Sequence, residues 1–186
     1  MLHKLIDRSG ETIKTNRCGN CTILVYRNAR SIDVIFTDGT IVKERKYGDF
    51  KNGNIYNPNH PTFYGVGFKG DGDYKCEISG KNSKRFKTWN GMLERCYSEK
   101  FKQSNHSYEG CIVDSFWHNF QNFAKWYDEN LNIKYMSKWC LDKDILVKGN
   151  KIYSSETCCF VPNEINVLFS LKRSKRGIYP IGVSLI

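Results

Sequence analysis

The sequence predicts an α+β protein in which strands come first and helices follow. Thr22–Arg27, Ser31–Phe36 and Gly39–Arg45 are rich in β-branched residues, and apolar side chains alternate along them. Asp38-Gly39 before the third segment is a strong hairpin signal, because both residues tolerate positive φ. We therefore expect a small antiparallel, barrel-like β module over residues 1–70.

The middle of the chain shows the apolar spacing of helices. Apolar side chains recur every three to four residues along Arg85–Tyr97 and again along Val113–Leu131. Asp114 or Ser115 could cap the second helix. We interpret both aromatic stripes as core-facing. The stretch Lys46–Tyr64, which precedes these helices, is rich in Gly, Asn and Pro and predicts a loop.

The last third predicts a strand, a turn, a second strand and a helix. The strands are expected around Trp139–Leu146 and Cys158–Val161, with a turn at Lys148–Asn150. Pro162 is suited to the first turn of a helix, where its missing N–H is harmless.

Charge is the first indication of function. Lys and Arg number 29 against 19 Asp and Glu, which gives a formal net charge of +10. A polyanion is the natural partner of such a chain, although solubility alone is the alternative explanation. An acidic DNA mimic is excluded. No apolar stretch approaches the ~20 residues needed to span a bilayer, so we expect no membrane association.

The eight cysteines do not form a disulfide pattern. Only Cys18 and Cys21 form a C-x-x-C pair, and Met1–Gly10 lacks the apolar run of a signal peptide. We expect reduced thiols in a cytoplasm, that of a bacterial host cell. Two of Cys140, Cys158 and Cys159 could meet across a hairpin, but we do not expect zinc, and buried thiols are the default interpretation.

Residues 139–169 read WCLDKDILVKGNKIYSSETCCFVPNEINVLF, and this order resembles the HNH, or ββα-metal, nuclease motif of phage proteins. Three upstream blocks found in the same proteins strengthen the resemblance, namely Trp89–Tyr97, Tyr108–Val113 and Trp117–Trp126. The resemblance covers roughly residues 85–171, and we expect an HNH-like module over 71–171.

The resemblance implies roles for four residues. Asp142 would be the strand ligand and Asn166 the helix ligand of a divalent ion, Mg²⁺ or Mn²⁺, and Asn150 would steady the loop. Lys143 occupies the position where HNH enzymes carry a histidine base, and lysine is protonated at neutral pH. Two alternatives follow. Either the module cuts slowly, with water activated by the metal or by Asp144, or it has lost catalysis and Lys143 contacts a phosphate.

Two further segments carry resemblances. Arg176–Val183 is similar to the opening strand of an Apetala-type DNA-binding domain, so 172–186 would be a basic linker and the truncated start of that domain. The N-terminal part resembles a repeat that precedes nuclease modules in phage and prophage proteins, which implies nucleic-acid binding. That repeat is carried by Ile32–Thr40, Tyr47–Phe50, Gly53–Ile55, Asn57–Pro58 and Gly65–Gly67.

DNA is therefore the expected partner, with phosphodiester cleavage as a metal-dependent extension. The expected nucleic-acid contacts are basic residues from three parts of the chain: Arg27, Arg30, Lys43, Arg45, Lys143, Lys148, Lys151, Lys172, Arg173, Lys175 and Arg176. The competing class is a non-enzymatic phage interaction protein that inhibits or redirects a host or defence protein. In that case the aromatic and basic surface would serve a protein partner.

Overall fold

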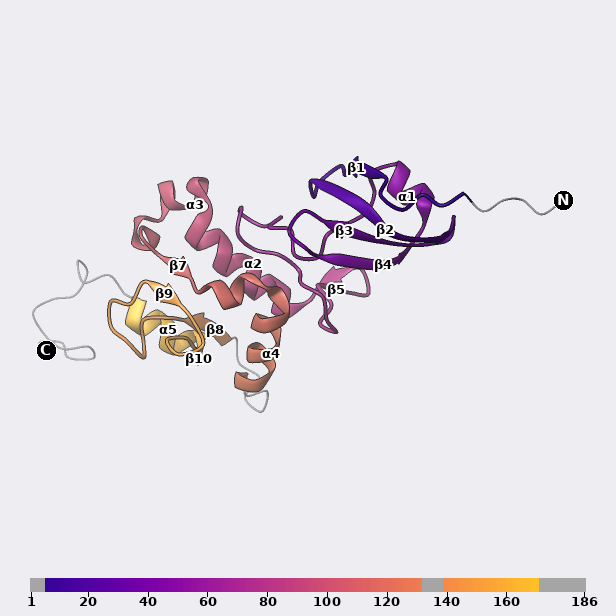
Figure 1. Cartoon of the computed structure of the whole chain (residues 1–186). Coiled ribbons are helices and arrows are strands. Elements are labelled where there is room, and N and C mark those ends of the chain that lie inside the picture. Colours follow the sequence, from indigo (N-terminus) through magenta and orange to yellow (C-terminus); the bar gives the residue numbers. More distant parts are fainter. Residues whose placement is uncertain (1–5, 132–138, 171–186) are drawn as a thin grey trace, which may run out of the picture. The chain divides into compact units, whose positions relative to one another are not determined.

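The computed structural model describes residues 6–131 and 139–170 (Figure 1). The chain divides into two compact units, one formed by Met1–Thr62 with Phe68–Asp71 and the other by Phe63–Gly67 with Gly72–Ile186. Strands dominate the first unit and helices the second, which confirms the α+β class. Within the described ranges, no helix has both the length and the apolar character required to cross a membrane.

The N-terminal unit is built on a four-stranded antiparallel sheet in the order β1-β2-β3-β4. Its strands are β1 (Thr12–Lys14), β2 (Asn20–Asn28), β3 (Ser31–Phe36) and β4 (Ile41–Arg45). The three predicted strands are thus confirmed. The expected barrel-like closure is not, because β1 and β4 remain at opposite edges of the sheet among the described residues.

Helix α1 (Tyr47–Lys51) lies inside the segment predicted as loop. It forms because Phe50 is fully buried among the sheet's core side chains, and tertiary packing of this kind outweighs the loop composition around it. The core of this unit consists of Cys18, Cys21, Ile23, Ile32, Val34, Phe36, Val42, Phe50 and Ile55. An irregularity in the β2–β3 register between Ile23 and Val25 breaks the alternation, so Leu24 and Val25 are both exposed.

In the C-terminal unit, α2 (Lys84–Tyr97) confirms the first predicted helix. Ser83 caps it by accepting a hydrogen bond from the N–H of Phe86. The small hairpin of β5 (Glu77–Ile78) and β6 (Lys81–Asn82) precedes α2, and α3 (Glu99–Ser104) and the 3-10 turn η1 (His106–Tyr108) follow it.

The second predicted helix is shorter than expected. The segment begins with β7 (Ile112–Val113) and a 3-10 turn, η2 (Ser115–His118), before α4 runs over Phe120–Asn130. Asp114 caps η2, and Asn119 starts α4 by accepting the N–H of Gln121. His118 is held by Tyr97 Oη at 3.3 Å and the main-chain oxygen of Val113 at 3.2 Å. Local side-chain bonds therefore divide what the apolar pattern presents as one helix.

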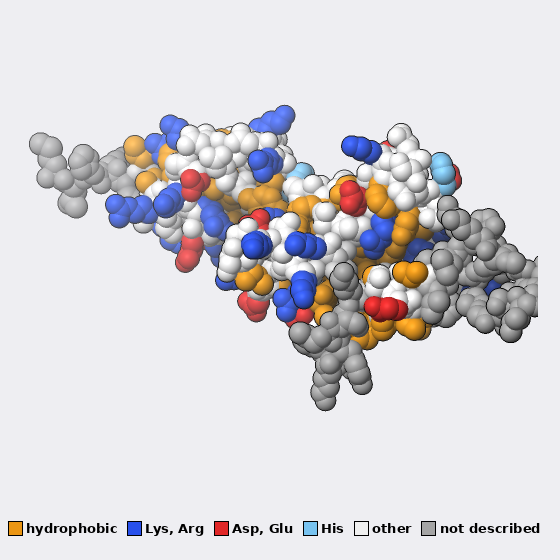
Figure 2. All heavy atoms as spheres, turned by 180° about the vertical axis from the view of Figure 1, so that it is seen from behind, with side chains coloured by type: hydrophobic (Ala, Val, Ile, Leu, Met, Phe, Trp, Pro, Cys, Tyr) orange, Lys and Arg blue, Asp and Glu red, His pale blue; other side chains and the backbone are white. Residues whose placement is uncertain are grey.

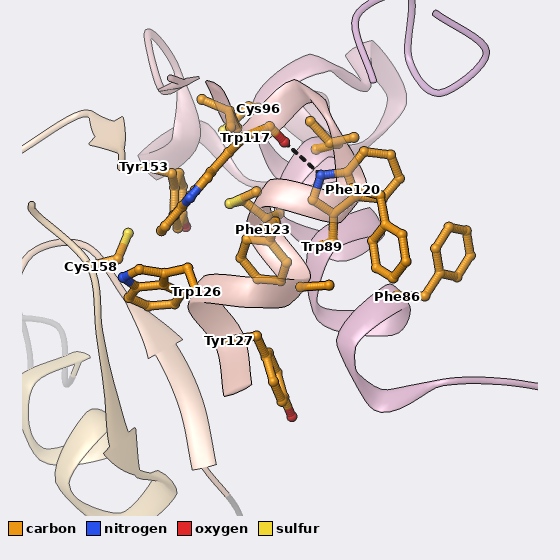
Figure 3. Packing of buried hydrophobic residues seen from close by; sticks show 14 of the residues in the cluster. Phe86, Trp89, Cys96, Trp117, Phe120, Phe123, Trp126, Tyr127, Tyr153 and Cys158 are labelled. Atoms are coloured by element: carbon orange, nitrogen blue, oxygen red, sulfur yellow. Dashed lines mark hydrogen bonds between the residues drawn. The ribbon is translucent and has the colours of Figure 1, made fainter. Parts of the chain in front are cut away.

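An aromatic core joins α2 and α4, as the two stripes predicted. Trp89 Nε1 donates a 2.7 Å hydrogen bond to the main-chain oxygen of Trp117 inside this core (Figure 3). Phe86, Trp89 and Phe120 contact one another edge-on or tilted, with centroids 5.5 to 5.8 Å apart. The buried side chains of α2 and α4 thus form one core, and residues of the following strands pack against it.

The last described segment folds as a strand–strand–helix arrangement. β8 (Trp139–Asp142) pairs antiparallel with β10 (Cys159–Pro162), and α5 (Asn163–Ser170) follows β10 directly and packs against both strands. Between them, β9 (Ile152–Tyr153) pairs in parallel with β7. Phe160 of β10 fixes this arrangement to the aromatic core, with its ring 5.3 Å from Trp126 and 5.0 Å from Tyr127.

Candidate nucleic-acid site

The loop that connects β8 to β10 carries most of the residues expected to act in a site. Asp142 ends β8 because its Oδ1 accepts the main-chain N–H groups of Asp144 at 2.7 Å and Ile145 at 2.8 Å. This turn explains why the strand stops at Asp142 and does not extend to Leu146 as predicted. Its other oxygen, Oδ2, accepts no hydrogen bond from the described residues.

Lys143 is buried inside this loop, with 6% of its surface exposed. Its Nζ donates one hydrogen bond of 2.7 Å to Asp144 Oδ1 and another of 2.7 Å to the main-chain oxygen of Asn150. The same nitrogen lies 5.8 Å from the centroid of the Tyr153 ring. Both of these hydrogen bonds of Nζ are thus donated to protein acceptors.

Asn150 closes the loop with three short-range bonds. Its Nδ2 donates to the main-chain oxygens of Lys143 at 2.9 Å and Ile152 at 2.6 Å, and its Oδ1 accepts the N–H of Ile152 at 3.1 Å. Gly149 before it adopts a φ of +77°, a conformation that glycine tolerates without strain. Asn150 therefore sets the path of the loop into β9.

Asn166 lies on α5, and α5 packs against β8, so Asp142 and Asn166 belong to one ββα unit. No group of three or more His, Cys, Asp or Glu that could hold a metal occurs in the described part of the chain. If a divalent ion bound Asp142 and Asn166, it would take most of its remaining ligands from water. Mg²⁺ tolerates this arrangement, since it usually keeps several waters and binds one or two protein oxygens.

A cation–aromatic cluster that the sequence did not reveal lies beside this loop. Arg95 of α2 donates from Nε to Tyr153 Oη at 3.2 Å. Its guanidinium carbon lies 5.5 Å from the ring centroid of Tyr153 and 5.9 Å from that of Tyr108. The helical pattern assigns Arg95 to the polar face of α2, and only the tertiary structure brings residues from η1 and β9 to it.

The basic residues predicted to contact nucleic acid differ in whether an acidic side chain already pairs with them. Lys148 and Lys151 are exposed, and Lys151 Nζ donates to the main-chain oxygen of Ser107 at 3.0 Å. Arg27 is exposed too, but both of its terminal nitrogens bind the carboxylate of Asp33, at 2.9 and 2.7 Å. Lysine and arginine side chains are spread over the visible face in Figure 2.

The remaining predicted contacts belong to the N-terminal unit or to the chain's end. Arg30 is exposed in the turn between β2 and β3. Lys43 and Arg45 of β4 line an open depression of about 750 Å³, which Asp49 and Asp71 also line. Lys172, Arg173, Lys175 and Arg176 lie outside the described residues.

Comparison with known proteins finds no matching family model, no matching curated protein and no matching solved structure. The functional argument therefore depends on the geometry and charge of the described residues.

Proposed function

We propose that this chain binds DNA and that its C-terminal unit is an HNH-like ββα module with weak or lost catalysis. One observation carries the proposal: α5 directly follows the β8–β10 hairpin and packs against both strands. Asp142 lies at the end of the first strand and Asn166 on the helix, which are the elements that carry the two metal ligands in the motif that the sequence resembles.

Charge supports the binding part of the proposal. The chain carries a net charge of +10, and Lys148 and Lys151 are exposed on the segment that joins β8 to β9. Cations of this kind displace counterions condensed on DNA, which gives affinity without regard to base sequence. We therefore place the DNA backbone against this loop.

The weak or lost catalysis follows from the contacts of Lys143. A general base must be within hydrogen-bond reach of water and able to take its proton. Lys143 is buried and donates to Asp144 and Asn150, whereas Asp144, the alternative base, is exposed and uses one carboxylate oxygen in this ion pair. If Mg²⁺ or Mn²⁺ binds, Asp142 and Asn166 would hold it, and the ion would supply charge stabilisation at a leaving oxygen.

A plasmid assay tests the proposal. The protein is incubated with supercoiled plasmid, with and without Mg²⁺ or Mn²⁺, and compared with Asp142→Ala and with Asp73→Ala, which alters an exposed acid outside the loop. We expect salt-sensitive retention of DNA by all three proteins, with little nicking. Any nicking should require metal and disappear in Asp142→Ala alone.

Two results would contradict the proposal. Efficient metal-dependent nicking that is lost in Asp142→Ala would contradict weak catalysis while supporting the ββα site. Absence of DNA retention at low salt would contradict DNA binding altogether and favour a protein partner.

A further inference from the structure

Arg95 carries a positive charge that the described protein does not neutralise. Its Nε bond to Tyr153 Oη is its one hydrogen bond to the described residues, and none of their carboxylate oxygens lies within 4.0 Å of it. Its two terminal nitrogens are not among the buried side-chain atoms that lack a partner, so their N–H groups can donate to water or to a ligand. The rings of Tyr108 and Tyr153 meanwhile fix where the guanidinium lies.

The neighbouring cations make the contrast clear. Lys143 is paired with Asp144 at 2.7 Å and Lys102 with Glu99 at 3.4 Å, whereas Arg95 has no such pair among the described residues. Burial, and then the adjacent Cys111 thiol, raise the pKa of Cys96 to about 12, while Arg95, Lys143 and Lys102 act in the opposite direction. The charges of Arg95, Lys143 and Lys102 therefore all lower the pKa of the buried Cys96 thiol.

Lys151 is a further cation, two residues before Tyr153 in the chain. Its Nζ donates to the main-chain oxygen of Ser107, the residue next to the Tyr108 ring that Arg95 contacts. That partner is a neutral carbonyl, so the charge of Lys151 also lacks an acidic partner among the described residues. Lys151 thus contacts Ser107 and Arg95 contacts Tyr108, and neither cation has a carboxylate partner among the described residues.

Arg85 shows what a purely structural arginine on the same helix does. Its guanidinium also lies over an aromatic ring, 5.7 Å from the Tyr74 centroid, but Asp128 binds it through two hydrogen bonds of 2.6 and 2.7 Å. Bidentate pairing of this kind satisfies both the charge and the geometry of the fork. Arg95, like Arg85, lies near aromatic rings, but no carboxylate of the described residues pairs with it.

We propose that Arg95 binds a backbone phosphate of DNA, with Tyr108 and Tyr153 holding its guanidinium in place and Lys151 contacting the same stretch of backbone. This inference rests on the proposed DNA binding and names a contact for it. Phosphate is the matching ligand, because its oxygens accept the paired N–H groups of an arginine fork. The ring contacts lower the entropy lost when that fork is engaged.

The test is the affinity for a short duplex DNA, measured by fluorescence anisotropy over a range of salt concentrations. Arg95→Gln is compared with wild type and with Arg85→Gln, which removes the same charge from the same helix. Circular dichroism and thermal unfolding establish that each variant is folded, and Arg95→Lys serves as a second variant that keeps the charge.

We expect Arg95→Gln to weaken binding about tenfold. The magnitude of the slope of log affinity against log salt should fall by about one, which corresponds to one lost phosphate contact. Arg85→Gln should change affinity less than about threefold, and Arg95→Lys should fall between wild type and Arg95→Gln. Equal affinities for Arg95→Gln and Arg85→Gln, with wild type still binding, would overturn the inference alone. If wild type itself fails to bind at low salt, the proposed function and this inference are both overturned.

Discussion

Lys143 and Asn150 hold each other through reciprocal hydrogen bonds. Lys143 Nζ donates to the main-chain oxygen of Asn150 at 2.7 Å, and Asn150 Nδ2 donates to the main-chain oxygen of Lys143 at 2.9 Å. The two side chains thus lock both ends of the loop that follows β8. Lys143, which the resemblance to HNH nucleases assigns to the base position, is therefore part of the framework of this loop.

The first prediction concerns the stability of that loop. Asn150→Ala removes three side-chain hydrogen bonds, one part-buried to Lys143 and two exposed to Ile152, and should lower the free energy of unfolding by about 1–3 kcal/mol. Urea unfolding measures the effect. Asn122→Ala, which removes one exposed bond to Phe116, is the control and should cost less than about 1 kcal/mol. Equal effects of both substitutions would argue against the lock.

The second prediction separates a structural Lys143 from a phosphate contact. Lys143→Met keeps the length and apolar body of the side chain while removing a charge that is buried and paired. We expect the salt dependence of DNA binding to keep its slope, because no phosphate contact is lost. Salt titration of the folded variant provides the measurement. A slope reduced by about one would show that Lys143 contacts the backbone directly.

The third prediction concerns acid. Hydrogen bonds from Arg27 and from the main-chain N–H of Glu44 hold the pKa of Asp33 at about 2, below its ordinary value of 3.8. A lowered folded-state pKa stabilises the fold above the unfolded-state value, and this contribution is lost as the pH falls through the folded-state value. The free energy of unfolding should therefore contain an Asp33 contribution that disappears between about pH 4 and pH 2.

Comparison of wild type with Asp33→Asn across this pH range measures that contribution. The difference in stability should be constant near neutral pH and shrink as the solution approaches pH 2. Asp73→Asn, which alters an exposed carboxylate without a partner in the described residues, should follow wild type throughout. A difference between wild type and Asp33→Asn that does not change with pH would contradict the role of the Arg27 contact.

The fourth prediction concerns the aromatic core. Trp89→Phe removes the Nε1 donor and leaves the buried carbonyl of Trp117 unsatisfied, in addition to creating a cavity. The expected loss is about 2–4 kcal/mol. Trp126→Phe, at the less buried edge of the same core, should cost less. Thermal and urea unfolding compare them, and a smaller loss for Trp89→Phe than for Trp126→Phe would contradict this description of the core.

The sequence predicts elements well where one local pattern decides them. Alternation and the Asp38-Gly39 turn locate β3 and β4, and the apolar spacing from Phe86 to Tyr97 locates α2. Prediction fails where distant contacts decide. Helix α1 depends on burial of Phe50, and β9 exists because Ile152 and Tyr153 pair in parallel with β7, far away in the sequence.

The same distinction applies to the candidate site. The motif order predicts that Asp142, Lys143, Asn150 and Asn166 belong to one ββα unit. In the structure Asp142 ends β8, Lys143 and Asn150 lie in the loop that follows, and Asn166 lies on α5. The sequence pattern does not reveal that Lys143 is buried or that Arg95 lies near the rings of Tyr108 and Tyr153. Those facts depend on how α2, η1 and β9 converge.

The most direct test of the account is the salt dependence of wild-type affinity for a duplex of random sequence, between about 50 and 300 mM KCl. We predict measurable binding at the lowest salt concentration and a linear fall of log affinity with log salt. The magnitude of the slope should be about 3 or more, as three or more neutralised phosphates require. No binding at the low end, or an affinity that does not change with salt, would contradict the claim that this chain binds the DNA backbone.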